Sequence, residues 1–280
     1  MVHKNNILTR ASKKPILWDA FYKSTGTQKP LVIFCHGYKG FKDWGAWDLV
    51  AEAFAEADLF FVKFNFSHNG GTMEQPIDFP DLDAFAENNY SKELDDLEDL
   101  ITFFRSTSNP FQAEIDPNEL ILIGHSRGGG IVTLKASEDH RITKLISWAG
   151  VSDFGKRTAT SGELEQWKKD GVKYVLNGRT KQKMPHNYQF YEDFKANEHR
   201  LHIESAVKKI AIPQLIIHAK DDPSVAFSEA EALHSWNPKS ILFPIENSDH
   251  VFGASHPWKA DHPPAPLEKV VEKSIDFIRQ

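Results

Sequence analysis

Short apolar runs alternate along this chain with segments whose apolar residues recur every three or four positions. The apolar runs are 30–37, 59–66, 119–126, 142–150, 213–222 and 240–250. The segments with helical periodicity are 47–58, 91–106, 127–138, 228–236 and 265–280. Apolar strands separated by helices are typical of a mainly parallel sheet that is covered on both faces. The sequence therefore predicts an α/β fold with right-handed crossovers.

One segment interrupts this alternation. Residues 155–209 contain no convincing strand and are rich in Tyr, Phe and Trp, within stretches that favour short helices. This length is well beyond that of an ordinary connection in an α/β domain. We therefore predict that 1–154 and 210–280 form the core and that 155–209 form a small helical cap. In the core, Ser91 is the expected N-cap of the helix at 91–106.

Composition and charge exclude several classes of protein. The chain has 280 residues and a net charge of -6, and its basic residues are scattered, which argues against a nucleic-acid partner. The single cysteine, Cys35, cannot form an intrachain disulfide and is expected to be a small core residue. No apolar run is long enough to span a membrane, and the N-terminal residues lack the apolar centre of a signal peptide. The expectation is a cytoplasmic protein of undetermined oligomeric state, with no membrane partner.

The run at 119–126 ends in "Gly124-His125-Ser126-Arg127-Gly128", which matches the pattern G-x-S-x-G between a predicted strand and a predicted helix. A sharp turn from strand to helix strains the backbone of its middle residue, and flanking glycines remove side-chain clashes. The Ser126 hydroxyl would then stand near a helix N-terminus, where backbone N–H groups stabilise negative charge. Ser126 is the predicted nucleophile; a Gly/Ser turn or a phosphate-binding loop is the alternative interpretation.

A serine nucleophile needs a base, and the base needs a carboxylate that orients it. Among the histidines, His250 directly follows the last predicted strand, where the loop reaches the carboxyl edge of the sheet. The preceding strand ends in Asp221 and Asp222, so either carboxylate could be the third member.

Read together, "GHSRGG", "CHGYKGF", "DHVFG" and the order Ser–Asp–His resemble the α/β-hydrolase superfamily over nearly the whole chain. The resemblance is to its esterase, dienelactone-hydrolase-like and serine-peptidase-like branches. Their pattern H-G-x-x-D-x-x-V matches His218 and Val225 and implies that Asp222 is the acid; Ala219 departs from it by replacing the glycine. The resemblance also implies an oxyanion hole made by the backbone N–H groups of Tyr38 and Arg127.

The predicted activity is hydrolysis of carboxylic esters with small to medium acyl groups, aromatic ones included, through an acyl-enzyme on Ser126. The expected partner is a small-molecule ester or short peptide, and neither a metal nor an organic cofactor is required. Dienelactone hydrolases use cysteine as the nucleophile in the turn between strand and helix. This chain has Ser126 at that position, which argues against dienelactone hydrolysis itself. A serine peptidase or amidase is the first alternative. An acyl transferase with the same triad and a non-catalytic binding module of the same fold remain open.

Overall fold

The computed structural model describes residues 1–158 and 163–280. Among them, eight strands form one sheet in the order β1-β2-β4-β3-β5-β6-β9-β10. The strands of this sheet are β1 Val2–Arg10, β2 Lys13–Phe21, β3 Lys29–Cys35, β4 Phe60–Asn65, β5 Ile115–His125, β6 Lys144–Trp148, β9 Gln214–Ala219 and β10 Ile241–Ile245. From β4 to β10 neighbouring strands are parallel, while β1 and β2 extend the β4 edge with antiparallel pairing.

The six strands predicted from apolar runs are confirmed, but β1 and β2 went unpredicted. Strand β2 contains Pro15 and the buried Asp19, which interrupt its apolar pattern. Strand β1 lies at the edge of the sheet and buries few side chains, so its sequence is largely polar.

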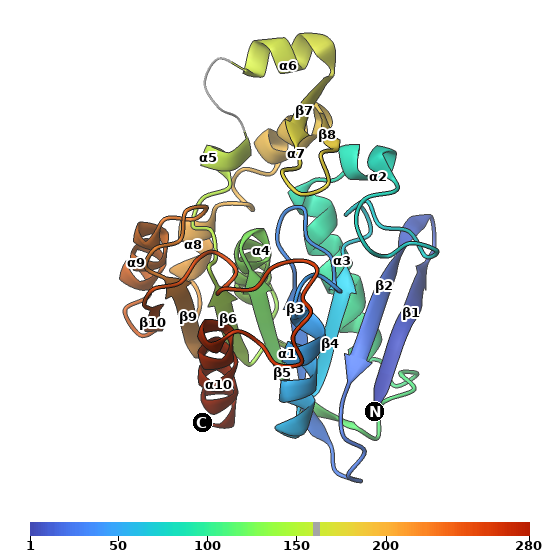
Figure 1. The fold of residues 1–280 in the computed structure, drawn as a ribbon, viewed down its shortest axis with the longest axis vertical. Helices are drawn as coiled ribbons and strands as arrows, with labels where there is room; N and C mark the ends of the chain where they lie inside the picture. The colour runs from blue at the N-terminus through green and yellow to red at the C-terminus, as the bar shows by residue number, and fades with distance from the viewer. Residues whose placement is uncertain (159–162) are drawn as a thin grey trace.

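Helices cover both faces of the sheet (Figure 1). Helices α1 (Trp47–Glu56) and α10 (Ala265–Arg279) pack on one face through side chains that include Phe54 and Val270. On the other face lie α3 (Tyr90–Arg105), α4 (Arg127–Glu138), α8 (Ile203–Val207) and α9 (Phe227–Trp236). This three-layer arrangement confirms the predicted α/β architecture. No helix of the described residues is long and apolar enough to cross a membrane.

The helix predicted at 91–106 begins one residue earlier and has a different cap. Its first residue is Tyr90, and the Asn89 side chain accepts a hydrogen bond from the Lys92 N–H. The prediction of Ser91 as N-cap was therefore wrong; Ser91 instead donates to Asp193 of the segment between β6 and β9. Helix α2 (Leu82–Ala86) precedes α3 and also lies near that segment.

The segment between β6 and β9 forms a layer beyond one end of the sheet (Figure 1). Its described elements are α5 Gly155–Thr158, α6 Leu164–Asp170, β7 Val172–Leu176, β8 Lys183–Asn187 and α7 Gln189–Ala196, followed by α8. The expectation of helices alone was wrong, because β7 and β8 pair as an antiparallel hairpin. The turn after β7 contains Asn177-Gly178, a dipeptide that favours hairpins and could have revealed this one.

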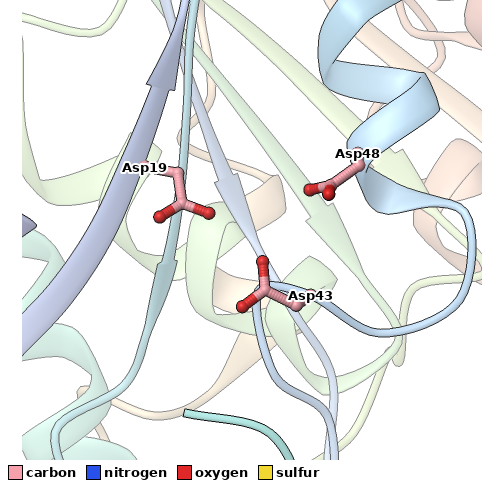
Figure 2. Close-up of side chains that lie close together, drawn as sticks. All are labelled: Asp19, Asp43 and Asp48. Carbon is pink, nitrogen blue, oxygen red and sulfur yellow. The ribbon is translucent and has the colours of Figure 1, made fainter. Parts of the chain in front are cut away.

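A partly buried group of ion pairs ties β2 and β4 to the chain that follows β3; Lys42, Lys63 and Asp19 are buried, whereas the Asp48 side chain is 39% exposed. Three carboxylates, those of Asp19, Asp43 and Asp48, converge from β2, a loop and α1 (Figure 2). The Lys63 ammonium of β4 lies 2.9, 2.6 and 2.7 Å from them, respectively. Lys42 adds a second buried ammonium, 2.9 Å from Asp19 and 2.6 Å from Asp43. We call these five residues the Lys/Asp cluster.

Candidate active site

The predicted nucleophile lies in a strained turn between β5 and α4. Ser126 has φ 57° and ψ −121°, a conformation that residues with side chains rarely adopt. The turn is possible because neighbouring positions lack side chains: a Cβ at Gly128 would lie 2.3 Å from the Cys35 carbonyl oxygen. Cys35 itself is fully buried in the core, as predicted.

The loop after β3 passes directly beside Ser126. A Cβ placed on Gly37 would lie 2.8 Å from the Ser126 Cβ, so only glycine fits there without movement. In the described chain the Tyr38 N–H donates to no residue, and the Arg127 N–H is the first of helix α4, where the helix supplies no acceptor. Both N–H groups are therefore available near Ser126, and their role as oxyanion donors stays a prediction.

His36 holds this loop against the end of β4. Its ring is buried, Nδ1 lies 2.9 Å from the Gly37 carbonyl oxygen, and Nε2 lies 3.3 Å from the Phe66 N–H. Burial lowers the pKa of His36 to about 4, so the ring is neutral at physiological pH and can accept the Phe66 N–H. The contacts are those of a structural residue.

Asp222 and His250 meet at the carboxyl ends of β9 and β10. The His250 Nδ1 and the Asp222 Oδ2 are 2.7 Å apart, while the backbone N–H groups of Ser224 and Val225 donate to Oδ1 at 2.7 and 2.9 Å. Burial opposes ionisation of Asp222, but the hydrogen bonds to its carboxylate hold its pKa well below its ordinary value. Asp221, the alternative acid, is exposed to solvent.

Two buried histidines that sequence reasoning left without a role support this pair. His125 Nε2 lies 2.8 Å from the backbone carbonyl oxygen of His250, and its ring packs 4.8 Å from the His250 ring. His218 Nε2 lies 2.8 Å from the Val225 carbonyl oxygen and 3.4 Å from the Asp222 carboxylate. Burial and then the charge of His250 lower the pKa of His125 to about 3, so it acts here as a neutral hydrogen-bonding residue.

Ser126 and His250 line the same two cavities. One has a volume of about 430 Å³ and is roofed by the segment between β6 and β9. The other, of about 130 Å³, lies towards Trp44 and Trp47. In the described chain the Ser126 hydroxyl makes no hydrogen bond, including to His250; such bonds are often long in unliganded enzymes and shorten in the complex.

Aromatic side chains from both the core and the roof line the larger cavity. Tyr90 stacks on Phe154 with ring centroids 3.9 Å apart, and Phe190 lies 4.8 Å from Tyr90. Trp167 also borders the cavity, whereas Tyr174 is 61% exposed and does not. The aromatic residues predicted for the cap thus divide between lining the cavity, packing and exposure.

Arg127 extends from the elbow into this aromatic wall. Its guanidinium lies 4.4 Å from the Tyr38 ring centroid and 5.3 Å from that of Tyr90. Its Nη1 is 3.3 Å from the carboxylate of Glu93, a buried residue of α3 that sequence analysis did not single out. Burial raises the pKa of Glu93, and Arg127 counteracts this by favouring the ionised form.

The Lys/Asp cluster is the one set of carboxylates in the described chain with the proximity of a metal site. A cation already occupies its centre, because the Lys63 ammonium lies within 2.9 Å of all three carboxylates. Carboxylates arranged around an ammonium have their charge neutralised without a metal ion. We therefore interpret the cluster as structural.

Comparison with known proteins supports a hydrolase. The family model described as alpha/beta hydrolase fold matches residues 30–183. The quorum-quenching protein AidA of Acinetobacter baumannii is 26% identical over 130 residues, which are 46% of this chain and 38% of AidA. The match therefore spans well under half the length of that relative.

Solved structures share the fold over nearly the full chain. Est1E from Butyrivibrio proteoclasticus, which has also been solved with ferulic acid bound, superposes with a TM-score of 0.71 at 17% identity, covering 96% of each chain. A putative hydrolase from Agrobacterium vitis S4 superposes with a TM-score of 0.72 at 16% identity, covering 99% of this chain and 98% of that one. At such identities the likeness establishes the fold.

Proposed function

The chain belongs to the alpha/beta hydrolase family, and from that premise we propose that it hydrolyses carboxylic esters through an acyl-enzyme on Ser126. The observation that carries the proposal is the 2.7 Å contact between Asp222 and His250, whose ring borders the same cavity as Ser126. A carboxylate at Nδ1 leaves Nε2 as the basic nitrogen, which is the tautomer that a serine nucleophile requires.

In the proposed reaction, His250 Nε2 takes the proton from the Ser126 hydroxyl as its oxygen attacks the ester carbonyl. The carbonyl oxygen becomes an oxyanion, stabilised by the N–H groups of Tyr38 and Arg127. The protonated His250 then gives its proton to the departing alcohol, and an ester to Ser126 remains. Water, deprotonated by His250, attacks this ester and releases the acid and Ser126. Asp222 keeps the imidazole oriented and stabilises its charged form.

The larger cavity is the proposed site of the acyl group. Its volume of about 430 Å³ suits a small to medium acyl chain, and the stacked rings of Tyr90 and Phe154 suit an aromatic one. The shared fold with Est1E, a protein solved with ferulic acid bound, is in line with this choice.

Labelling with a fluorophosphonate probe tests the nucleophile. The wild-type protein is expected to be labelled, and the Ser126→Ala variant is expected to remain unlabelled and to lose hydrolysis of 4-nitrophenyl esters. Ser152→Ala is a matched control, because Ser152 lies outside both cavities that Ser126 borders. Equal labelling of wild type and Ser126→Ala would refute the proposal, and faster cleavage of aminoacyl anilides than of esters would favour the peptidase alternative.

A further inference from the structure

The larger cavity carries an excess of positive charge. Its charged lining residues are Lys39, Arg127, Arg157 and Lys173, and no carboxylate of the described residues lines it. Two of these cations have a carboxylate partner behind the cavity wall. Arg127 lies 3.3 Å from Glu93, and Arg157 forms an ion pair with Glu229. The ammonium groups of the two lysines are therefore the charges most available to a ligand.

The positive charge of Lys39 has fewer polar partners than that of Lys173. It lies in the loop that follows β3, next to Tyr38, and its ammonium is 5.0 Å from the Tyr38 ring centroid. Within residues 1–158 and 163–280 it makes no ion pair or hydrogen bond. Burial and then the charge of Arg127 lower the pKa of Lys39, so its charged form is disfavoured where it stands. A nearby anion would reverse that penalty.

Lys173 lines the cavity from β7, in the segment between β6 and β9. Its ammonium lies 3.8 Å from the Trp167 ring centroid and 3.3 Å from the Thr158 carbonyl oxygen. Burial lowers the pKa of Lys173, and the exposed Glu163 counteracts this effect. The positive charge of Lys173 is thus partly balanced by the Thr158 carbonyl oxygen and by Glu163, and the ammonium packs on the Trp167 ring.

The positive charges of the cavity lower the pKa of a buried histidine that also lines it. His186 of β8 lines the cavity, and its Nε2 lies 2.7 Å from the Tyr38 hydroxyl. Burial, then the charges of Arg127, Lys173 and Lys39, lower the pKa of His186 to about 3. Three cations from the core and the roof therefore act on one point of the cavity, where the histidine stays neutral and adds no charge of its own.

We propose that this cavity selects esters whose acyl group ends in a carboxylate, which the ammonium groups of Lys39 and Lys173 bind. The inference rests on the proposed ester hydrolysis and narrows its substrate class. Aromatic rings along the wall would hold the apolar part of the acyl chain, while the carboxylate reaches the lysines. Both lysines are half-buried, which strengthens such charge-assisted contacts relative to a fully exposed site, because less water screens them.

Three 4-nitrophenyl esters of matched size and different charge test the inference. They are mono-4-nitrophenyl adipate, 4-nitrophenyl 6-methylheptanoate and the ester of 5-(trimethylammonio)pentanoate, which carry negative, neutral and positive ends. We expect kcat/KM for the adipate ester to exceed that for the neutral ester by about 10-fold to 100-fold, the range of a net hydrogen bond to a charged group. The cationic ester should be the poorest substrate, and added salt should reduce the differences.

Variants of the two lysines locate the selectivity. Lys39→Met and Lys173→Met should each lower the ratio of kcat/KM for the adipate ester to that for the neutral ester, and Lys39→Glu should invert the preference towards the cationic ester. Lys169→Met is the matched control, because Lys169 is an exposed lysine of α6 that does not line the cavity. An unchanged ratio in both methionine variants would overturn the assignment to these lysines.

Failure of this inference is distinguishable from failure of the proposed function. Equal kcat/KM for all three esters in a wild-type protein that depends on Ser126 would overturn the charge selectivity and leave ester hydrolysis in place. Hydrolysis that persists in Ser126→Ala would overturn the proposed function instead. Calorimetry with monomethyl adipate and Ser126→Ala measures binding without turnover, and salt-sensitive binding that is lost in Ser126→Ala/Lys39→Glu is the expected result.

Discussion

Two groups of largely buried charged side chains lie towards the two edges of the main sheet, one at β2 and β4 and one after β9 and β10, and they differ in what surrounds them. In the Lys/Asp cluster, two ammonium groups and three carboxylates face one another at 2.6 to 2.9 Å. In the pair Asp222 and His250, the carboxylate is fully enclosed by hydrogen-bond donors, whereas the ring borders two cavities.

This difference distinguishes structural charge from chemically available charge. Every charged group of the Lys/Asp cluster forms an ion pair with another member, so none is left to bind a ligand. His250 uses Nδ1 for Asp222 and keeps its other nitrogen free of any partner in the described chain. A cluster of buried titratable residues therefore marks a reactive site only where one of its atoms remains open to a cavity.

The largest expected effect is on chemistry. Asp222→Asn should lower kcat by about 10⁴-fold, or about 5.5 kcal/mol of transition-state stabilisation, because the amide favours the wrong imidazole tautomer. Thermal unfolding should change little by comparison, since the amide oxygen can still accept from the Ser224 and Val225 N–H groups. Asp221→Asn is the matched control and should stay active; a large loss there with an active Asp222→Asn would reverse the assignment.

The next effect is on stability. Lys63→Met removes an ammonium from among three carboxylates and should lower the free energy of unfolding by about 3–5 kcal/mol, the cost of unpaired buried charge. Chemical denaturation measures it. The folded variant should retain its kcat/KM for esters, because Lys63 lines neither cavity beside Ser126. A catalytic loss as large as that of Asp222→Asn would contradict the division between the two groups.

Acid should weaken the Lys/Asp cluster. Burial opposes ionisation of Asp43, but the charges of Lys63 and Lys42 lower its pKa from 3.8 to about 2. Because the folded-state pKa is depressed, its stabilisation, roughly 2 kcal/mol, is present above pH 4 and is lost as the pH falls towards 2. Denaturation curves across this window should show a steeper loss for wild type than for Asp43→Asn. Parallel curves would contradict a contribution from Asp43.

The smallest effect is expected at the rim of the cluster. Lys4 forms an ion pair with Asp48, and its side chain is 43% exposed. Solvent screens such a pair, so Lys4→Met should change the free energy of unfolding by less than about 1 kcal/mol. Chemical denaturation of Lys4→Met and Lys63→Met under the same conditions gives the comparison. Equal losses in the free energy of unfolding would show that burial does not control the contribution of these ion pairs.

The sequence predicted the parts of the fold whose signal is local. Continuous apolar runs revealed the strands from β3 to β10 in the main sheet, since both faces of the central strands are buried; the edge strand β10 is only partly buried but is still a continuous apolar run. Strand β2 was not predicted, because a charged residue such as Asp19 is not expected in a buried strand. Its charge is neutralised by Lys42 and Lys63, which lie elsewhere in the sequence. The hairpin of β7 and β8 was not predicted because β7 is largely exposed and β8 contains Pro185, so neither strand is a continuous apolar run, although Asn177-Gly178 gave a local sign of the turn.

The candidate site was predictable for a similar reason. Ser126, Asp222 and His250 each follow a strand, and parallel strands bring their carboxyl ends to one edge of the sheet. The catalytic roles of these residues stay predictions. The lysines of the cavity could not be found this way, because Lys39 and Lys173 line one cavity only when the segment between β6 and β9 folds back over the end of the sheet.

The roof of the cavity belongs to one uninterrupted stretch of chain, and that has a consequence for how such a protein can diversify. Ser126 precedes this stretch, while Asp222 and His250 follow it. A single exchange of the DNA that encodes this segment could change the size and the charge of the cavity. The proposed proton-transfer residues would stay where they are. Swapping in the corresponding stretch of another family member is thus a direct way to change the proposed ester selectivity.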